Sequence, residues 1–218
     1  MSDDQPGAAL GRRAVVMGGL AAAMLPGVAR ADVVCRDNPY HGIRQCSSGI
    51  RRIQLVQAMQ ECPQWCWAAC IQMAFAKYGW RVPQTDIVQR LFGDMRCAPA
   101  NGSQIVATVN SGPWRDVRGR MFRARAAPLA DLDFGMSNGN ALRDAAWHLA
   151  DGIPLINGAL NHATLLTSMT YAIDRQGRVF LQEMIVRDPY PYQDARPSRR
   201  SLTQREVSGT RLLVSIRV

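Results

Sequence analysis

The sequence has no continuous apolar segment of the roughly 18 to 20 residues that a membrane-spanning helix needs. It also has no internal repeat and no low-complexity tract. Its 218 residues are 47% hydrophobic and 20% charged, which is typical of a globular protein and not of a disordered one. We therefore expect one domain with a sizeable core and no stable insertion in a membrane.

Lysine is almost absent, although the chain is strongly basic. Of the 26 lysine and arginine residues, Lys77 is the only lysine, and the formal net charge is +9. Such a charge is compatible with acidic envelope polymers or with nucleic acid. However, the arginines are scattered, and no basic patch is interleaved with aromatic residues. We therefore attribute the arginine content to genome composition and expect no nucleic-acid partner.

The first 31 residues have the features of an export signal. Arg12-Arg13 precede a moderately apolar segment, and Ala29-Arg30-Ala31 has the small-x-small form of a signal peptidase site. The arginine pair and the weakly hydrophobic segment resemble a twin-arginine signal, and a general secretory signal is the alternative. We expect residues 1–31 to be an export signal and residues 32–218 to form a periplasmic or secreted domain.

The hydrophobic pattern changes from helical to strand-like along this domain. Helices are expected over residues 65–78, 83–93, 101–112 and 138–152, and strands over 51–57, 153–159, 162–173, 178–188 and 211–218. The segment 32–50 is typical of a loop, and 113–138 shows no clear pattern. Because the helices come first and the strands last, the predicted fold class is α+β, with a helical half packed on an antiparallel sheet. Residues 65–78 are apolar nearly all round, which predicts a central, buried helix.

Three cysteines, Cys62, Cys66 and Cys70, are spaced four residues apart. A zinc or iron–sulfur site would need a second ligand cluster, and none exists, because Cys97 is isolated and the three histidines are dispersed. The spacing is also not the Cys-x-x-Cys of redox dithiols. We therefore predict no metal and no cofactor. Pro63 suits the start of a helix, so it separates Cys62 from the helix and puts Cys66 near the first turn.

A thiol in the first turn of a helix is activated. Unpaired backbone N–H groups and the positive end of the helix dipole favour an anion there, which shifts Cys66 toward the nucleophilic thiolate. Cys70 lies one turn further along, inside the apolar segment, and is predicted to be an inert core residue. All six cysteines lie after the export signal, in a compartment that permits disulfides.

The segment around Cys66 resembles the papain-like cysteine peptidases. Gln60, five intervening residues and then Cys66-Trp67-Ala68-Ala69 match the Gln…Cys-Trp-Ala signature of that superfamily. The string Gln-Trp-Cys-Trp-Ala-Ala, residues 64–69, is similar to a bacterial branch that includes AvrRpt-type effector peptidases of plant pathogens. The resemblance implies a papain-like fold in which Cys66 opens the central helix. It also implies that the Gln60 side chain and the Cys66 N–H form an oxyanion hole.

A later stretch resembles the bacteriocin-processing peptidases. It runs from His162-Ala163 through Asp174-x-x-Gly177 to Asp188-Pro189, and with it the resemblance covers about residues 53–190. This match implies that His162 is the histidine of the site.

A nucleophilic cysteine needs a general base and a group that orients the base. His41 lies in a loop upstream of Cys66, and His148 lies on the polar side of its helix, so we interpret both as surface residues. His162 begins an apolar strand just after a turn-like segment, and active sites form at such strand ends. His162 is therefore the predicted base.

Turn chemistry links His162 to Asp188. Asp174 and Gly177 occupy the first and fourth positions of a type I turn, which in a hairpin usually closes a three-residue loop. Residue 174 then faces 178, and residue 164 faces 188. His162 and Asp188 become diagonal neighbours on one face, within reach of a hydrogen bond. A two-residue loop would put them on opposite faces.

Two other interpretations of the carboxylates stay open. Asp188 alone would be read as the start of a turn, and Asp174 is a second candidate to orient the histidine. Turn formation already explains Asp174, and the chain order Cys66, His162, Asp188 favours Asp188.

These residues predict an exported cysteine peptidase that acts on a peptide or protein substrate. Cys66 attacks the carbonyl, His162 transfers the protons, Asp188 orients His162, and Gln60 with the Cys66 N–H stabilises the oxyanion. Trp65 and Trp67 flank the nucleophile. Either is a candidate to border the substrate, although core packing is favoured.

The remaining cysteines are expected to form disulfides. The analogy with papain, which has a disulfide cysteine just before its nucleophile, implies that Cys62 pairs with Cys97. Cys35 and Cys46 are expected to pair because they are close in sequence, which leaves Cys70 free. No long inhibitory propeptide fits between residues 32 and 60, so we expect control by location or by a partner.

Two alternative functions remain open. One is a catalytically idle papain-like module that binds a peptide or partner, although such a module has no chemical reason to keep the nucleophile, base, orienting carboxylate and amide together. The other is an envelope peptidase that cuts peptidoglycan stem peptides. Those enzymes typically resemble a Cys, His, His pattern, and no second histidine follows His162. The oligomeric state is not determined by the sequence.

Overall fold

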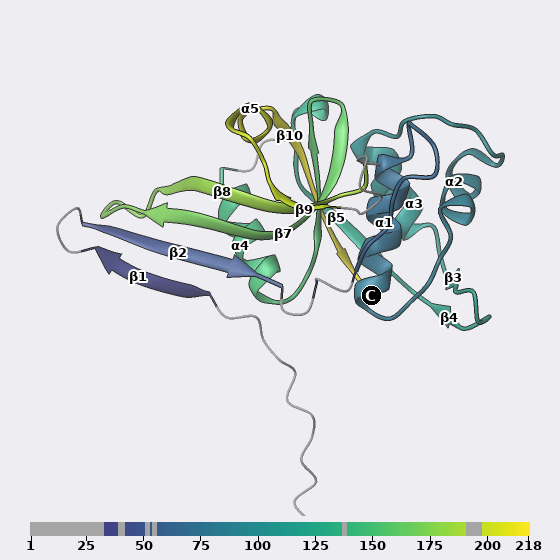
Figure 1. Cartoon of the computed structure of the whole chain (residues 1–218), viewed down its shortest axis with the longest axis horizontal. Coiled ribbons are helices and arrows are strands. Elements are labelled where there is room, and N and C mark those ends of the chain that lie inside the picture. The colour runs from purple at the N-terminus through teal and green to yellow at the C-terminus, as the bar shows by residue number, and fades with distance from the viewer. Residues whose placement is uncertain (1–32, 39–41, 51–52, 54–55, 137–138, 191–197) are drawn as a thin grey trace, which may run out of the picture.

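The computed structural model describes residues 33–38, 42–50, 53, 56–136, 139–190 and 198–218. The predicted export signal, residues 1–31, lies outside this part of the chain. The described residues form five α-helices and an eight-stranded sheet, which confirms the α+β class (Figure 1). All paired strands of the sheet are antiparallel.

The sheet is organised around its longest strand, β7 (His162–Ile173). One edge of β7 pairs with β8, and the other edge is shared by β6 near its start and β2 near its end. The order β1-β2-β7-β6-β10-β5 completes the sheet, and β9 extends it beyond β8. The bounds are β1 (Val34–Asn38), β2 (Ile43–Gly49), β5 (Arg125–Asp131), β6 (Leu155–Ala159), β8 (Val179–Asp188), β9 (Ser198–Ser201) and β10 (Thr210–Arg217).

Three helices gather at one end of the molecule, and the long strands β1, β2, β7 and β8 project at the other (Figure 1). These helices are α1 (Cys66–Lys77), α2 (Gln84–Phe92) and α3 (Gly102–Asn110). The other helical elements are α4 (Ala141–Ala150), α5 (Gln204–Ser208) and the 3-10 turn η2 (Leu132–Phe134), and a separate ribbon pairs β3 (Trp114–Arg115) with β4 (Met121–Phe122). Within the described residues, none of the helices combines the length and apolarity required to cross a bilayer.

Helix α1 is central, as its apolar sequence predicts. It packs on β6 and β7 and contacts α2. Its side chains from Trp67 to Phe75 are almost all buried, because a helix without a polar face is stable only when it is enclosed. The predicted ends of the next helices also agree with the structure. Gly93 closes α2 in the left-handed conformation, and Asn101 begins α3 with a capping box.

The N-terminal segment differs from its prediction. Residues 32–50 were expected to be a loop, but they contain β1 and β2, which form a hairpin that joins the sheet on β7. These strands contain few apolar residues. Their stability therefore comes from the pairing of β2 with β7 and from a disulfide between Cys35 and Cys46. The expected order of helices first and strands last is therefore wrong, because β1, β2 and β5 come from the first part of the chain.

The strand expected over 51–57 falls largely outside the described residues, since 51, 52, 54 and 55 are not described. Ile53 and Val56 are described, and they are buried outside any strand. In the unassigned segment 113–138, the structure contains β3, β4, β5 and η2.

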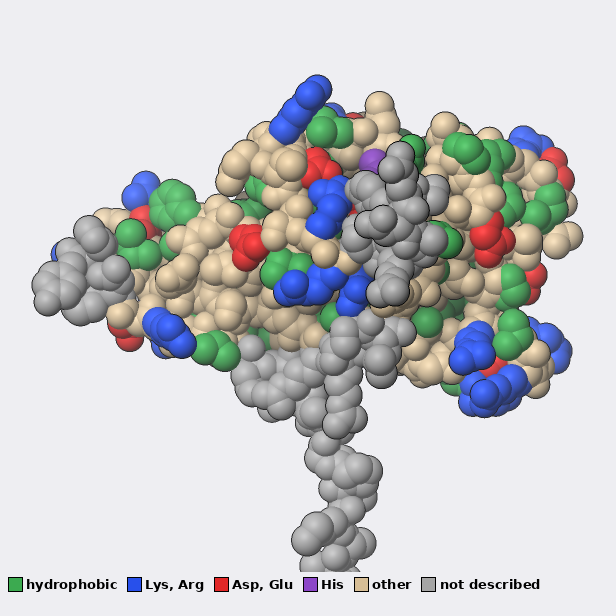
Figure 2. Space-filling model, in the orientation of Figure 1, with side chains coloured by type: hydrophobic (Ala, Val, Ile, Leu, Met, Phe, Trp, Pro, Cys, Tyr) green, Lys and Arg blue, Asp and Glu red, His purple; other side chains and the backbone are tan. Residues whose placement is uncertain are grey.

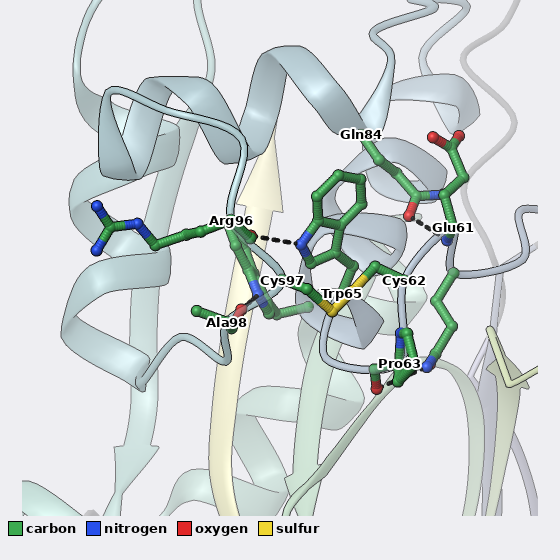
Figure 3. The surroundings of a disulfide bond; sticks show 10 residues. Glu61, Cys62, Pro63, Trp65, Gln84, Arg96, Cys97 and Ala98 are labelled. Carbon is green, nitrogen blue, oxygen red and sulfur yellow. Dashed lines mark hydrogen bonds between the residues drawn. A yellow bond between two sulfur atoms is a disulfide. The ribbon is translucent and has the colours of Figure 1, made fainter.

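Both expected disulfides are present, Cys35–Cys46 and Cys62–Cys97. The second connects the residues just before α1 to the loop after α2 (Figure 3). The indole of Trp65 donates a hydrogen bond to the Arg96 carbonyl at 2.9 Å beside this disulfide. Closing loops of these lengths stabilises the fold by roughly 3 to 4 kcal/mol each in the chain-entropy model. The residues just before α1 are therefore attached to the loop after α2 by a disulfide and by a hydrogen bond.

On the face shown in Figure 2, the arginine and lysine side chains lie in several separate groups. This distribution agrees with the scattered positions of arginine in the sequence.

Candidate active site

Cys66 is the first residue of α1, and its thiol faces the start of β7. The Ala163 N–H donates a hydrogen bond to Cys66 Sγ at 3.4 Å. Burial by itself raises the pKa of the thiol, but hydrogen bonds from His162 and from the backbone N–H groups of Ala163 and Trp67 outweigh it, so the pKa lies below its ordinary value. Cys66 therefore has the environment of a thiolate.

His162 is the first residue of β7, and it lies between Cys66 and a carboxylate. Its Nε2 is 2.8 Å from Asp188 Oδ1, which leaves Nδ1 for the contact with Cys66. Burial alone would lower the pKa of the imidazole. The hydrogen bonds and charges of Asp188 and Cys66 act in the opposite direction and raise the pKa of His162 to about 9. The geometry thus favours a thiolate beside an imidazolium.

Asp188 is the last residue of β8 and is only 1% exposed. Besides His162, its Oδ1 accepts a hydrogen bond from the Tyr190 N–H at 2.9 Å, and its Oδ2 accepts one from Arg200 Nε at 2.7 Å. Burial raises the pKa of this carboxyl, but the hydrogen bonds from His162 and the other donors hold it well below its usual value. Asp188 is therefore a charged carboxylate that orients the ring of His162.

Arg200 continues this chain of contacts and was not identified from the sequence. It lies on β9, and its Nη1 and Nη2 donate to the two carboxylate oxygens of Glu206 at 3.0 and 2.6 Å. Glu206 also accepts from Thr203 in the capping box that begins α5, and these donors lower the pKa of Glu206 to about 2, although its partial burial acts against them. The capping-box pattern predicts a helix start, but no sequence signal indicates that the arginine reaches Asp188.

The register of the β7–β8 hairpin brings His162 and Asp188 together. Its turn has the predicted three-residue loop, with Gly177 in the left-handed conformation and Ile173 facing Val179. Further along, β8 contains one extra residue, and later β7 contains one, so the two shifts cancel. The ladder ends in the predicted register, and the two side chains lie on one face.

The other candidate bases and carboxylates lie elsewhere. His41 falls outside the described residues. His148 is on α4, where burial lowers its pKa and its Nδ1 has no hydrogen-bond partner among the described residues. Asp174 is at the far end of the hairpin, where it accepts hydrogen bonds from Gln176 and Arg178 of its own turn. Neither His148 nor Asp174 is brought to Cys66.

Gln60 is buried and is joined by its backbone to the residues that follow Asp188. Its backbone N–H donates to the Pro189 carbonyl at 2.8 Å, which joins it to the residues after Asp188. Its side-chain Nε2 donates to the Pro63 carbonyl at 2.9 Å, and Oε1 is buried without a partner among the described residues. An amide nitrogen carries two hydrogens, so one N–H of Nε2 is left for an oxyanion.

The two tryptophans beside the nucleophile differ in position. Trp65 is 6% exposed and packs in the core beside the Cys62–Cys97 disulfide (Figure 3). Trp67 is also buried, and its Nε1 donates to the Ala98 carbonyl at 3.1 Å, but it forms part of the wall of a cavity next to Cys66. Of the two, only Trp67 therefore borders the space that a substrate would enter.

That cavity has a volume of about 680 Å³ and is open to Cys66 and His162. Its walls come from the start of α1, the start of α3, the end of β5, the β6–β7 turn and β10. The turn residues Leu160 and Asn161 both have positive φ, a conformation that leucine rarely adopts. This tight turn makes His162 the first residue of β7, opposite Ala159.

Within the described residues, no three His, Cys, Asp or Glu side chains are grouped so that they could hold a metal ion. No protein-family model matches the chain, and no curated protein matches it.

Proposed function

We propose that this protein is an exported, papain-like cysteine peptidase that hydrolyses peptide bonds. The observation that carries the proposal is the unbroken contact from Cys66 through His162 to Asp188 beside a cavity large enough for a peptide side chain. These three residue types in this order are those that nucleophilic acyl transfer requires. The two disulfides support an oxidising compartment, and residues 1–31 are proposed as the signal that leads there.

The proposed reaction begins with attack of the Cys66 thiolate on the peptide carbonyl carbon. The carbonyl electron pair moves to oxygen, and the tetrahedral intermediate collapses as His162 gives its proton to the leaving amine. A thioester between Cys66 and the acyl part of the substrate remains. Water then attacks the thioester carbonyl while His162 takes a proton from the water. The C–S bond breaks, which releases the carboxylic acid and restores the thiolate and the imidazolium.

The oxyanion is proposed to be held by the Cys66 N–H and Gln60. As the first residue of α1, Cys66 has a backbone N–H without an intrahelical acceptor. Gln60 keeps one N–H of Nε2 besides the hydrogen bond to Pro63. Both donors would be fixed before the reaction, which is the arrangement that stabilises developing charge.

Labelling with a thiol-reactive peptidyl electrophile under non-reducing conditions tests the nucleophile. We expect the parent protein and the Cys70→Ala variant to be labelled at the same rate, and the Cys66→Ala variant not to be labelled. Cys70 is the matched control because it is one helical turn away, fully buried, and has a pKa that burial raises well above its ordinary value. Labelling of Cys66→Ala at the parental rate would refute the assignment.

Digestion of a peptide library then tests the activity. We expect peptide cleavage by the parent and none by Cys66→Ala. If Cys66 is labelled but neither peptides nor peptidoglycan fragments are cleaved, the protein is an idle binding module. If only stem peptides are cleaved, it is an envelope peptidase.

A further inference from the structure

Asp131 is a buried carboxylate that borders the cavity at Cys66. It is the last residue of β5 and only 4% exposed, and it lines the same cavity as Cys66 and His162. Its backbone is fixed by two hydrogen bonds with Met136, N–H to carbonyl in both directions, at 3.0 and 2.8 Å. The side chain is therefore held in place by backbone pairing.

The carboxylate of Asp131 lies against the first residue of α3. A Cβ atom built on Gly102 would be 2.1 Å from Asp131 Oδ2, so only glycine leaves room for the carboxylate there. The positive end of the α3 dipole supports the negative charge of Asp131.

Among the described residues, the Asp131 carboxylate has no cation and no hydrogen-bond donor as a partner. Buried carboxylates in folded proteins are normally paired, because removing the charge from water is costly. The oxygens of this carboxylate can therefore accept hydrogen bonds from a ligand that enters the cavity.

The other charged side chains of the cavity compensate one another. The Cys66 thiolate faces the His162 imidazolium, and the exposed Asp133 pairs with Arg211 through its carboxylate. Asp131 thus gives the cavity a net charge of −1, in a chain whose formal net charge is +9. A low-polarity wall around a single charge strengthens its attraction for an ion of opposite sign.

The remaining walls are mixed, with amide side chains such as Gln64 and Gln104 beside a larger share of apolar surface. Trp67, Ile105, Leu160 and Leu212 contribute side chains to them. Apolar walls that end at a carboxylate suit a long aliphatic stem with a cationic head, and a short amine would leave these walls uncovered. A glutamate side chain would meet Asp131 with like charge.

We propose that this cavity is a specificity pocket that binds an arginine or lysine side chain of the substrate through Asp131. The proposal rests on the proposed peptidase function, because the pocket shares its space with Cys66 and His162. The cationic residue would therefore lie close to the bond that is cut. The substrate class that follows is basic peptides or proteins.

Peptide pools with one position fixed as arginine, lysine, citrulline or glutamate test the pocket. Citrulline keeps the size and hydrogen-bonding shape of arginine but has no charge. At one position near the cleaved bond, we expect the parent to cleave arginine or lysine peptides with a kcat/KM about 10- to 100-fold above that for citrulline peptides. The free energy of a hydrogen bond to a charged group corresponds to a factor of this size. Glutamate at that position should be the poorest.

The Asp131→Asn variant removes the charge and keeps the shape. We expect it to lose the preference for arginine over citrulline. The Asp133→Asn/Arg211→Gln double variant is the control, because it removes both members of an existing ion pair of the cavity and leaves the net charge of −1, so it should keep the preference. The midpoint of thermal unfolding of each variant shows whether it is folded. If Asp131→Asn does not fold, the ratio of kcat/KM for arginine and citrulline peptides, measured with the parent protein, still tests the pocket.

Binding to the Cys66→Ala variant separates this proposal from the peptidase function. Calorimetric titration with the arginine and citrulline pools needs no turnover. Binding that favours arginine and is lost in the Cys66→Ala/Asp131→Asn double variant supports the pocket even if no peptide is cleaved. Cleavage without a preference for arginine or lysine at any position overturns the pocket and leaves the peptidase function intact. Absence of both cleavage and arginine-selective binding overturns both.

Discussion

Replacing Asp188 with asparagine tests why this position carries a carboxylate. Three donors converge on it: His162 Nε2 at 2.8 Å, the Tyr190 N–H at 2.9 Å and Arg200 Nε at 2.7 Å. A carboxylate accepts on both oxygens, whereas asparagine would turn its NH₂ toward either His162 or Arg200. The variant therefore loses the ionic contact with His162 and also leaves one donor facing another donor.

The size of the effect follows from the pKa of His162. The contacts with Asp188 and Cys66 raise it from the ordinary 6.5 to about 9, a difference of about 2.5 pH units that corresponds to on the order of 3 kcal/mol of stabilisation of the imidazolium. Without the carboxylate, only the contact with Cys66 still opposes the effect of burial, so the pKa of His162 should fall. The imidazolium that pairs with the Cys66 thiolate then becomes less populated at neutral pH.

The rate of alkylation by iodoacetamide as a function of pH measures this directly, because it needs no substrate. For the parent, we expect the rate of alkylation to be constant around neutral pH, where the thiolate is paired with the imidazolium. The rate should move to a different level as the pH rises through about 9, where His162 loses its proton. For Asp188→Asn, that transition should move to lower pH, and kcat/KM should fall at neutral pH. A transition that stays near pH 9 in a folded variant would refute the role of the carboxylate.

The same contact makes a prediction about stability. Because the pKa of His162 is raised on folding, its contribution is fully present below pH 6.5 and is lost as the pH rises through about 9. Because the pKa of Asp188 is lowered, its contribution is present above pH 3.8 and is lost as the pH falls below that value. Asp188→Asn should therefore be destabilised most between about pH 4 and pH 6.5. The effects of Asp188→Asn and Arg200→Met on stability should not be additive, because the two side chains contact each other.

Three further predictions concern the neighbouring residues. Gln60→Ala should lower kcat by about 100-fold or more if its amide stabilises the oxyanion, while alkylation of Cys66 stays unchanged; equal loss of both would assign Gln60 a structural role instead. The Cys62→Ser/Cys97→Ser pair should lower the free energy of unfolding by roughly 3 to 4 kcal/mol in chemical denaturation, and an unchanged midpoint would contradict this. Cys70 should resist alkylation in the folded protein and react only after unfolding, as peptide mapping can determine.

The sequence alone determined most of the helices and the nucleophile. The apolar segment after Pro63 predicts a buried helix that starts close to Cys66, because helix periodicity and proline geometry are local properties. The β7–β8 turn is local as well, since Asp174 and Gly177 specify its type. The register that follows from this turn places His162 next to Asp188.

Tertiary structure decided the parts that depend on contacts between distant segments. The β1–β2 hairpin has little apolar pattern, and it forms because β7 has a free edge and Cys35 pairs with Cys46. Arg200 and Asp131 look like ordinary surface charges in the sequence. The pairing of β9 with β8 brings Arg200 to Asp188, and the pairing of β5 with β10 brings Asp131 to the cavity. Long-range strand pairing leaves no periodic signal in these residues, so only the folded chain shows what their charges face.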